Sequence, residues 1–161
     1  MKNLLILLFC VSLTIPSFAQ TSDAEAAAMA NLLGVQKKEA IAKLVEISGK
    51  DSVAFWKIYD EYQKENVQMG KNRIQLYEKT AHAYSNMSAS LADSLSQKYF
   101  QNRLDQEKSL QDYYNKIKTA TNAVVAFQFY QAEVYLLTQI RATIMQQIPT
   151  YGEFKQLMKK Y

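Results

Sequence analysis

Apolar and polar residues recur with helical spacing over most of this 161-residue chain, and residues that break helices are rare. Between residues 20 and 148 there is no proline, and the only glycines are Gly34, Gly49 and Gly70. Sheets need turn residues at much closer intervals. Because Ala, Leu, Gln, Lys and Glu fill many of the positions between these glycines, the pattern predicts an all-α fold built from long helices.

Three helix-start signals divide this region into four predicted helices. Ser48 followed by Asp51 matches a capping box, in which the side chain at the helix start accepts a hydrogen bond from a free backbone N–H group. Ser88 and Thr121 are predicted to begin the third and fourth helices, and Pro149 to end the fourth. We expect a hairpin-like bundle or cradle. The predicted helices span residues 24–47, 49–84, 88–117 and 121–148.

The fourth predicted helix carries few charges and two apolar stripes. Between residues 119 and 148, Glu133 and Arg141 are the only charged residues. One bundle core needs one stripe, so the other should meet more of this chain or a second copy. This helix is therefore expected to be central and to form the face of a homodimer. One stripe contains Val124, Phe127, Val134, Leu137, Ile144 and Ile148. The other contains Val125, Phe129, Ala132, Leu136 and Ile140.

Residues 1–19 have the organisation of a secretory signal peptide. Lys2 provides a basic start, an apolar run follows over residues 4–15, and Ala19 closes a small-residue cleavage site. The apolar run is too short to span a bilayer as a helix, which takes about 20 residues. Cleavage would also remove Cys10, the only cysteine. We therefore expect residues 20–161 to be exported to the periplasm as one cysteine-free domain with no membrane span.

Charge and residue chemistry exclude several classes of function. The formal net charge of +4 is a mild excess, well short of a nucleic-acid-binding signature. His82 is the only histidine, so neither a metal site nor a histidine-activated serine is expected. The sequence accordingly predicts no enzyme, no catalytic residues and no cofactor.

Two aromatic segments carry a resemblance to a known family. The segment FWKIYDEY at residues 55–62 and the segment FYQAE at residues 129–133 resemble segments of small periplasmic helical proteins of the Spy and CpxP group, which includes uncharacterised Bacteroidetes members. The resemblance extends over roughly residues 35–150. The positions that carry it are Phe55, Trp56, Tyr59, Tyr62, Gln131, Glu133 and Pro149.

The chain also departs from this group. Its better-known members have a Leu-Thr-x-x-Gln signature at helix starts, whereas this chain reads ISGKD at residues 47–51 and MSASL at residues 87–91. The capping hydroxyl remains and the glutamine is lost. Because the hydroxyl satisfies free amide donors at the helix start, the expectation for the fold is unaffected.

The resemblance implies an ATP-independent chaperone or envelope-stress protein. In that group, a cradle-shaped dimer holds unfolded clients on a basic, partly apolar concave face, and a related branch contains metal-responsive sensors. For this chain the expected partners are unfolded or envelope proteins and a second copy bound through the fourth helix. Two alternatives remain open, namely a helical protein that binds one specific envelope partner and a sensor-type regulator.

Overall fold

The computed structural model describes residues 36–146, and this part of the chain is helical without strands. The predicted all-α fold is therefore confirmed. The predicted signal peptide, the start of the first predicted helix, Ile148 and Pro149 lie outside the described residues. The helical elements are residues 36–44, α2 (Gly49–Ala83), the short 3-10 helix η1 (Tyr84–Asn86), α3 (Ala89–Ala120) and α4 (Ala123–Met145).

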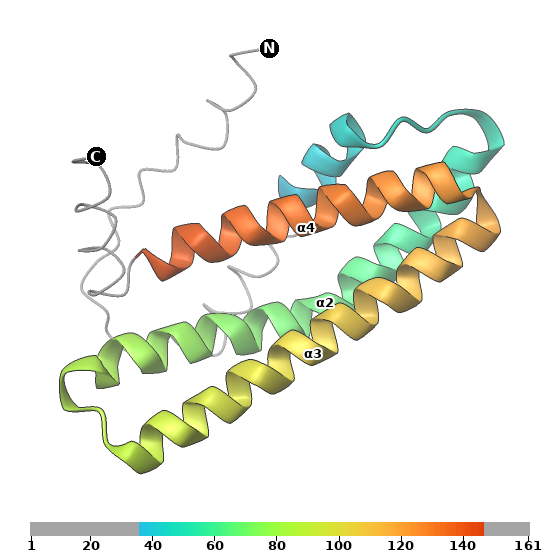
Figure 1. The fold of residues 1–161 in the computed structure, drawn as a ribbon. Coiled ribbons are helices and arrows are strands. Elements are labelled where there is room, and N and C mark those ends of the chain that lie inside the picture. Colours follow the sequence, from blue (N-terminus) through green and yellow to red (C-terminus); the bar gives the residue numbers. More distant parts are fainter. Residues whose placement is uncertain (1–35, 147–161) are drawn as a thin grey trace.

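The two longest helices, α2 and α3, form an antiparallel hairpin that turns at η1 (Figure 1). The last helix, α4, runs back along α3, and residues 36–44 lie beside α4. The hairpin end near η1 extends beyond α4, because α4 has 23 residues and α3 has 32. Helix α4 contacts α2, α3 and residues 36–44, and one of its faces stays exposed.

The starts of α2 and α3 lie where the sequence predicts them, but only one of the two has the predicted side-chain cap. The Ser88 hydroxyl accepts a hydrogen bond from the Leu91 backbone N–H at 3.2 Å, as expected. Ser48 precedes α2 without any side-chain capping bond, so the predicted capping box is wrong. Gly49, the next residue, has a φ of 61°. This left-handed conformation, which glycine adopts without steric cost, turns the chain away from the geometry that a capping hydroxyl requires.

The boundary between α3 and α4 also differs from the prediction. Thr121 ends α3 rather than starting α4, and its hydroxyl donates to the Ile117 carbonyl at 2.8 Å. The cap of α4 is Asn122, whose side-chain oxygen accepts from the N–H groups of Val124 at 2.9 Å and Val125 at 3.1 Å. A single Asn oxygen thus satisfies two free donors, while the Thr121 hydroxyl already points back to α3.

The core lies at the end of the hairpin that α4 and the N-terminal segment cover. Phe55, Tyr59 and Tyr62 are fully buried there, and Trp56 packs against them partly exposed. The ring of Phe129 from α4 meets the first three edge-on, with ring centroids 5.4–6.4 Å apart, a favourable aromatic geometry. Phe55, Trp56, Tyr59 and Tyr62, four of the positions that carry the family resemblance, therefore lie in or against the core. The core residues are Ile41, Val45, Phe55, Tyr59, Tyr62, Leu110, Tyr113, Ile117, Val125, Ala126, Phe129, Ala132 and Leu136.

Candidate functional site

A buried carboxylate lies at the centre of this core. Glu133, on the inner face of α4, is fully buried and accepts three hydrogen bonds from other elements. The donors are Lys37 Nζ of the N-terminal segment at 2.9 Å, the Tyr59 hydroxyl at 3.0 Å and the Tyr62 hydroxyl at 2.8 Å. We refer to these four residues as the Glu133 cluster. It joins the N-terminal segment, α2 and α4 at one point.

The cluster is built to stabilise a negative charge in an apolar surrounding. A buried carboxylate is costly unless a counter-ion and hydrogen bonds replace the lost water, and Glu133 has one cation and two hydroxyl donors. Burial and the neighbouring Glu133 carboxylate raise the pKa of both Tyr59 and Tyr62 well above its ordinary value of about 10. Both hydroxyls therefore stay protonated and act as donors. Behind them, Gln63 donates to the Tyr59 oxygen at 2.7 Å.

Three of the positions that carry the family resemblance meet in this cluster, namely Tyr59, Tyr62 and Glu133. Gln131 instead lies exposed on the outer face of α4. The sequence analysis missed Lys37, although a signal was present. Lys37 is in line with the buried Ile41 and Val45 at spacings of four residues, so it occupies the apolar face of its helix.

The Glu133 cluster has the character of a structural anchor. Its donors all point to Glu133, and Lys37 Nζ also lies 5.0 Å from the centroid of the Tyr62 ring. A group that accepts three bonds in a closed core has no free face for a substrate. What the arrangement can do is hold residues 36–44 against α2 and α4.

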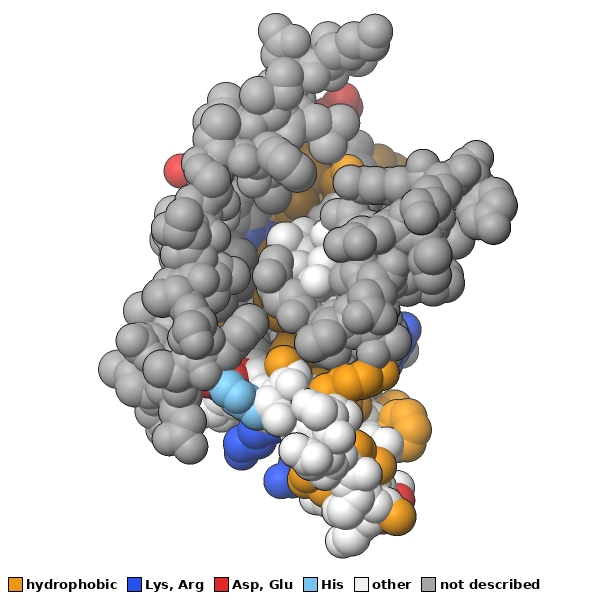
Figure 2. Space-filling view, turned by 90° about the vertical axis from the view of Figure 1, so that its left-hand side faces the viewer, with side chains coloured by type: hydrophobic (Ala, Val, Ile, Leu, Met, Phe, Trp, Pro, Cys, Tyr) orange, Lys and Arg blue, Asp and Glu red, His pale blue; other side chains and the backbone are white. Residues whose placement is uncertain are grey.

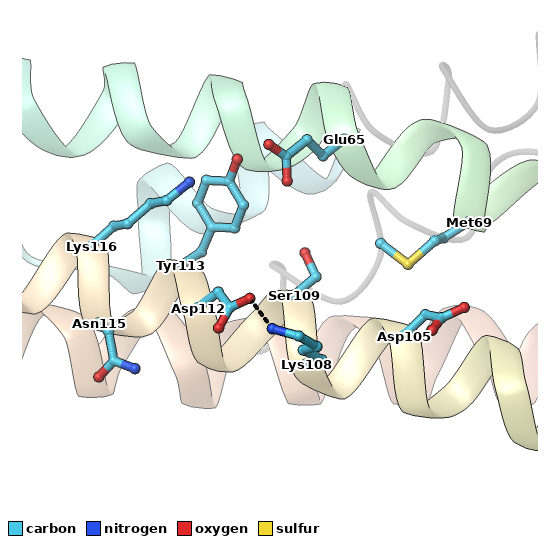
Figure 3. A pocket seen from close by; sticks show the side chains of 9 residues that line it. All are labelled: Glu65, Met69, Asp105, Lys108, Ser109, Asp112, Tyr113, Asn115 and Lys116. Atoms are coloured by element: carbon cyan, nitrogen blue, oxygen red, sulfur yellow. Dashed lines mark hydrogen bonds and ion pairs between the residues drawn. The ribbon is translucent and has the colours of Figure 1, made fainter.

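An open groove of about 690 Å³ runs between α2 and α3 (Figure 3). Its charges are partly paired within it, since Lys108 bonds Asp112 at 2.7 Å and Lys116 Nζ lies 3.9 Å from the centroid of the Tyr113 ring. The buried Tyr113 hydroxyl faces the Glu65 carboxylate (Figure 3). Burial, followed by the Glu65 carboxylate, raises the pKa of Tyr113. The groove thus offers polar and charged side chains for contacts.

Large apolar side chains are exposed on the outer faces of α3 and α4. On α3, Phe100 and Leu104 are 61% and 64% exposed and lie one helical turn apart. On α4, Val124, Phe127 and Tyr135 are at least half exposed and follow one another at helical spacing, with Gln131 between the last two. We call the α3 residues the α3 pair, and Val124, Phe127, Gln131 and Tyr135 the α4 outer stripe.

The two apolar stripes predicted for the fourth helix are thus only partly as expected. The stripe containing Val125, Phe129 and Ala132 faces the core, with Leu136 also buried and Ile140 half-buried. The other stripe divides, because Val124 and Phe127 are exposed whereas Val134, Leu137 and Ile144 are half-buried. The exposed face continues through Tyr135, a residue that the predicted stripe did not include.

Neither a metal centre nor a membrane span is found in the described part of the chain. Within residues 36–146, no three His, Cys, Asp or Glu side chains come together as metal ligands. None of the helices described there is both long and apolar enough to cross a membrane.

Comparisons with known proteins do not assign this chain to a family. The chain matches no family model, no curated protein and no solved structure. The resemblance to the Spy and CpxP group stays a prediction that rests on the residues named above.

Proposed function

We propose that this protein is an ATP-independent holdase that works outside the cytoplasm, in the manner implied by its resemblance to the Spy and CpxP group. The leader-like residues 1–19 support export to the periplasm. An extracytoplasmic chaperone has no ATP to drive release, so it must bind clients through weak, reversible contacts. A surface with exposed apolar side chains on a stable helical frame suits that task.

The observation that carries the proposal is the exposure of apolar side chains on the outer faces of α3 and α4, of which the α3 pair is assigned to clients and the α4 outer stripe to a second copy. Exposed apolar side chains that gather on one face commonly mark a surface that binds another molecule. Apolar contacts are non-directional, so they can hold an unfolded chain without requiring a particular sequence. At the hairpin end, Tyr84 and Leu91 are also exposed, and Figure 2 shows hydrophobic side chains there as well as basic ones.

The formal net charge, +4 for the full sequence and +3 once Lys2 leaves with residues 1–19, supports a second, weaker contribution. Long-range attraction speeds the encounter with acidic segments of a client and weakens as salt screens it. Protection by apolar contacts persists under the same conditions. A holdase of this kind should therefore lose part of its activity in high salt and keep the rest.

We also propose that the α4 outer stripe joins two copies of the chain in a homodimer. Helix pairing through an exposed apolar stripe is self-complementary around a two-fold axis. The α3 pair would then remain for clients. Analytical ultracentrifugation tests this point, since Phe127→Ser should shift a dimer toward monomer while Val53→Ser should not. Val53 is the matched control because it is 76% exposed on α2, outside both surfaces.

The holdase proposal is tested by light scattering from two unrelated aggregating clients. Near-stoichiometric amounts of the purified protein, without nucleotide or metal, should slow the aggregation of both clients. The double variant Phe100→Ser and Leu104→Ser should protect less, and Val53→Ser should protect as the parent does. No protection of either client, together with no binding of a hydrophobic dye, would refute the proposal. Recovery of one defined protein from envelope extract would then favour the alternative of a specific envelope partner.

A further inference from the structure

A second buried polar cluster lies away from the Glu133 cluster, where α2, α3 and α4 meet. Arg73 of α2 is only 7% exposed. Its Nη2 donates to Gln106 Oε1 of α3 at 2.5 Å, and its Nε donates to Asn102 Oδ1 at 3.2 Å. From α4, Arg141 Nη2 approaches the same Gln106 oxygen at 3.4 Å. Two guanidinium groups thus converge on one neutral amide.

Within residues 36–146, these two charges have no carboxylate partner. Among the ion pairs formed within residues 36–146, none involves Arg73 or Arg141. The Nη2 atoms of Arg73 and Arg141 both approach Gln106 Oε1, so they lie within about 6 Å of each other. Like charges at this separation repel each other in a protein interior. Burial, and then the charge of Arg141, lower the pKa of Arg73. Buried charges are normally paired with an anion, and residues 36–146 provide none for these two arginines.

The donor groups have the chemistry that such an anion needs. A guanidinium carries five N–H donors, and the two amide contacts of Arg73 use only two of them. Arginine forks match the paired oxygens of carboxylate and phosphate groups. Asn102 is itself held in place, because its Nδ2 donates to the Met69 carbonyl at 3.1 Å. The amides therefore position the guanidinium groups and leave donors for a ligand.

We propose that Arg73 and Arg141 form a binding site for a small oxyanion, a phosphate or a carboxylate, with Gln106 holding the two guanidinium groups together. Binding would replace the repulsion between the two arginines by attraction to a shared anion. None of these three residues belongs to the α3 pair or the α4 outer stripe. A failure of the holdase proposal would therefore leave the anion site untouched, and the reverse also holds.

Thermal unfolding of the purified protein at constant ionic strength tests the site, with chloride replaced stepwise by inorganic phosphate or by acetate. At least one of these anions should raise the melting temperature. At one hundred times its Kd, a ligand that binds only the folded state raises the ratio of folded to unfolded protein about 100-fold. Isothermal calorimetry with the same anion should give one site per chain. A response to phosphate alone assigns a phosphate-type ligand, and an equal response to acetate assigns a carboxylate.

Two variants separate a binding site from a general salt effect. Arg141→Gln should weaken the anion response about tenfold, and in chloride it should melt no lower than the parent because the repulsion is gone. Arg103→Gln removes the same charge from an exposed position on α3 and should keep the full response. An equal response in all three proteins, or no response to either anion, would overturn the proposal. A lower melting temperature for Arg141→Gln in chloride would also count against it, since that outcome assigns Arg141 a merely structural role.

Discussion

Replacing Glu133 by glutamine should destabilise the protein far more than a surface substitution does. Glutamine keeps the shape of the side chain but removes the negative charge that accepts three hydrogen bonds. Lys37, which is buried, would lose its counter-ion. Removing one partner of a buried ion pair costs about 3–5 kcal/mol, because the remaining charge stays uncompensated. For a domain of this size, that loss corresponds to a fall in melting temperature of roughly 10–15 °C.

The neighbouring lysine provides a matched control. Lys38 pairs with Asp60 on the surface, and both side chains are more than 40% exposed. Because solvent screens such a pair, Lys38→Met should cost no more than about 1 kcal/mol. Added salt should reduce that cost further and leave the effect of Glu133→Gln almost unchanged.

A double-mutant cycle measures how strongly Glu133 and Lys37 are coupled. Urea unfolding followed by far-UV circular dichroism gives the free energy of unfolding for the parent, Lys37→Met, Glu133→Gln and the double variant. The double variant should lose less stability than the two single variants together, with a coupling energy of about 0.5–3 kcal/mol. Strict additivity, or a Glu133→Gln protein that melts like the parent, would refute the view that a buried ion pair anchors the N-terminal segment.

Two further predictions concern the tyrosines and a helix cap. The pKa values of Tyr59, Tyr62 and Tyr113 are raised in the folded state. The stability that the three neutral hydroxyls contribute is therefore complete below about pH 10, the ordinary tyrosine pKa, and is lost as the pH rises above it. Ultraviolet titration should show three fewer tyrosines ionising in the folded protein than in urea, and equal numbers would contradict their burial. Asn122→Ala should lower the free energy of unfolding by about 1 kcal/mol, whereas Ser48→Ala, at a start without a capping bond, should leave it within about 0.5 kcal/mol. Urea unfolding compares the two variants, and equal losses would disprove the assigned caps.

The helical character of the chain follows from local properties, and the sequence predicts it well. Scarcity of proline and glycine, together with helical spacing of apolar residues, depends only on near neighbours along the chain. The start of α3 is predicted for the same reason, because the Ser88 hydroxyl bonds an amide three residues away. Burial of Phe55, Tyr59 and Tyr62 also follows from their spacing on one helical face.

The boundary of α4 shows where local reasoning fails. Thr121 and Asn122 are both acceptable caps, and the choice between them depends on where α3 ends and how the chain turns. Ser48 is a suitable capping residue as well, yet the left-handed Gly49 beside it prevents the bond. Backbone direction at a turn is set by the packing of the helices that it connects, which a sequence motif does not contain.

Tertiary structure alone decides which charged residues meet. Glu133 and Lys37 are 96 positions apart, and Gln106 is 33 positions from Arg73 and 35 from Arg141. Periodicity can place each of them on a helix face, but it cannot show which face of another helix lies opposite. The sequence by itself therefore determined that this chain folds into long amphipathic helices. Only their packing decided that one buried carboxylate has three donors and that two arginines contact one amide with no carboxylate of residues 36–146 beside them. Such contacts depend on how distant helices cross and align.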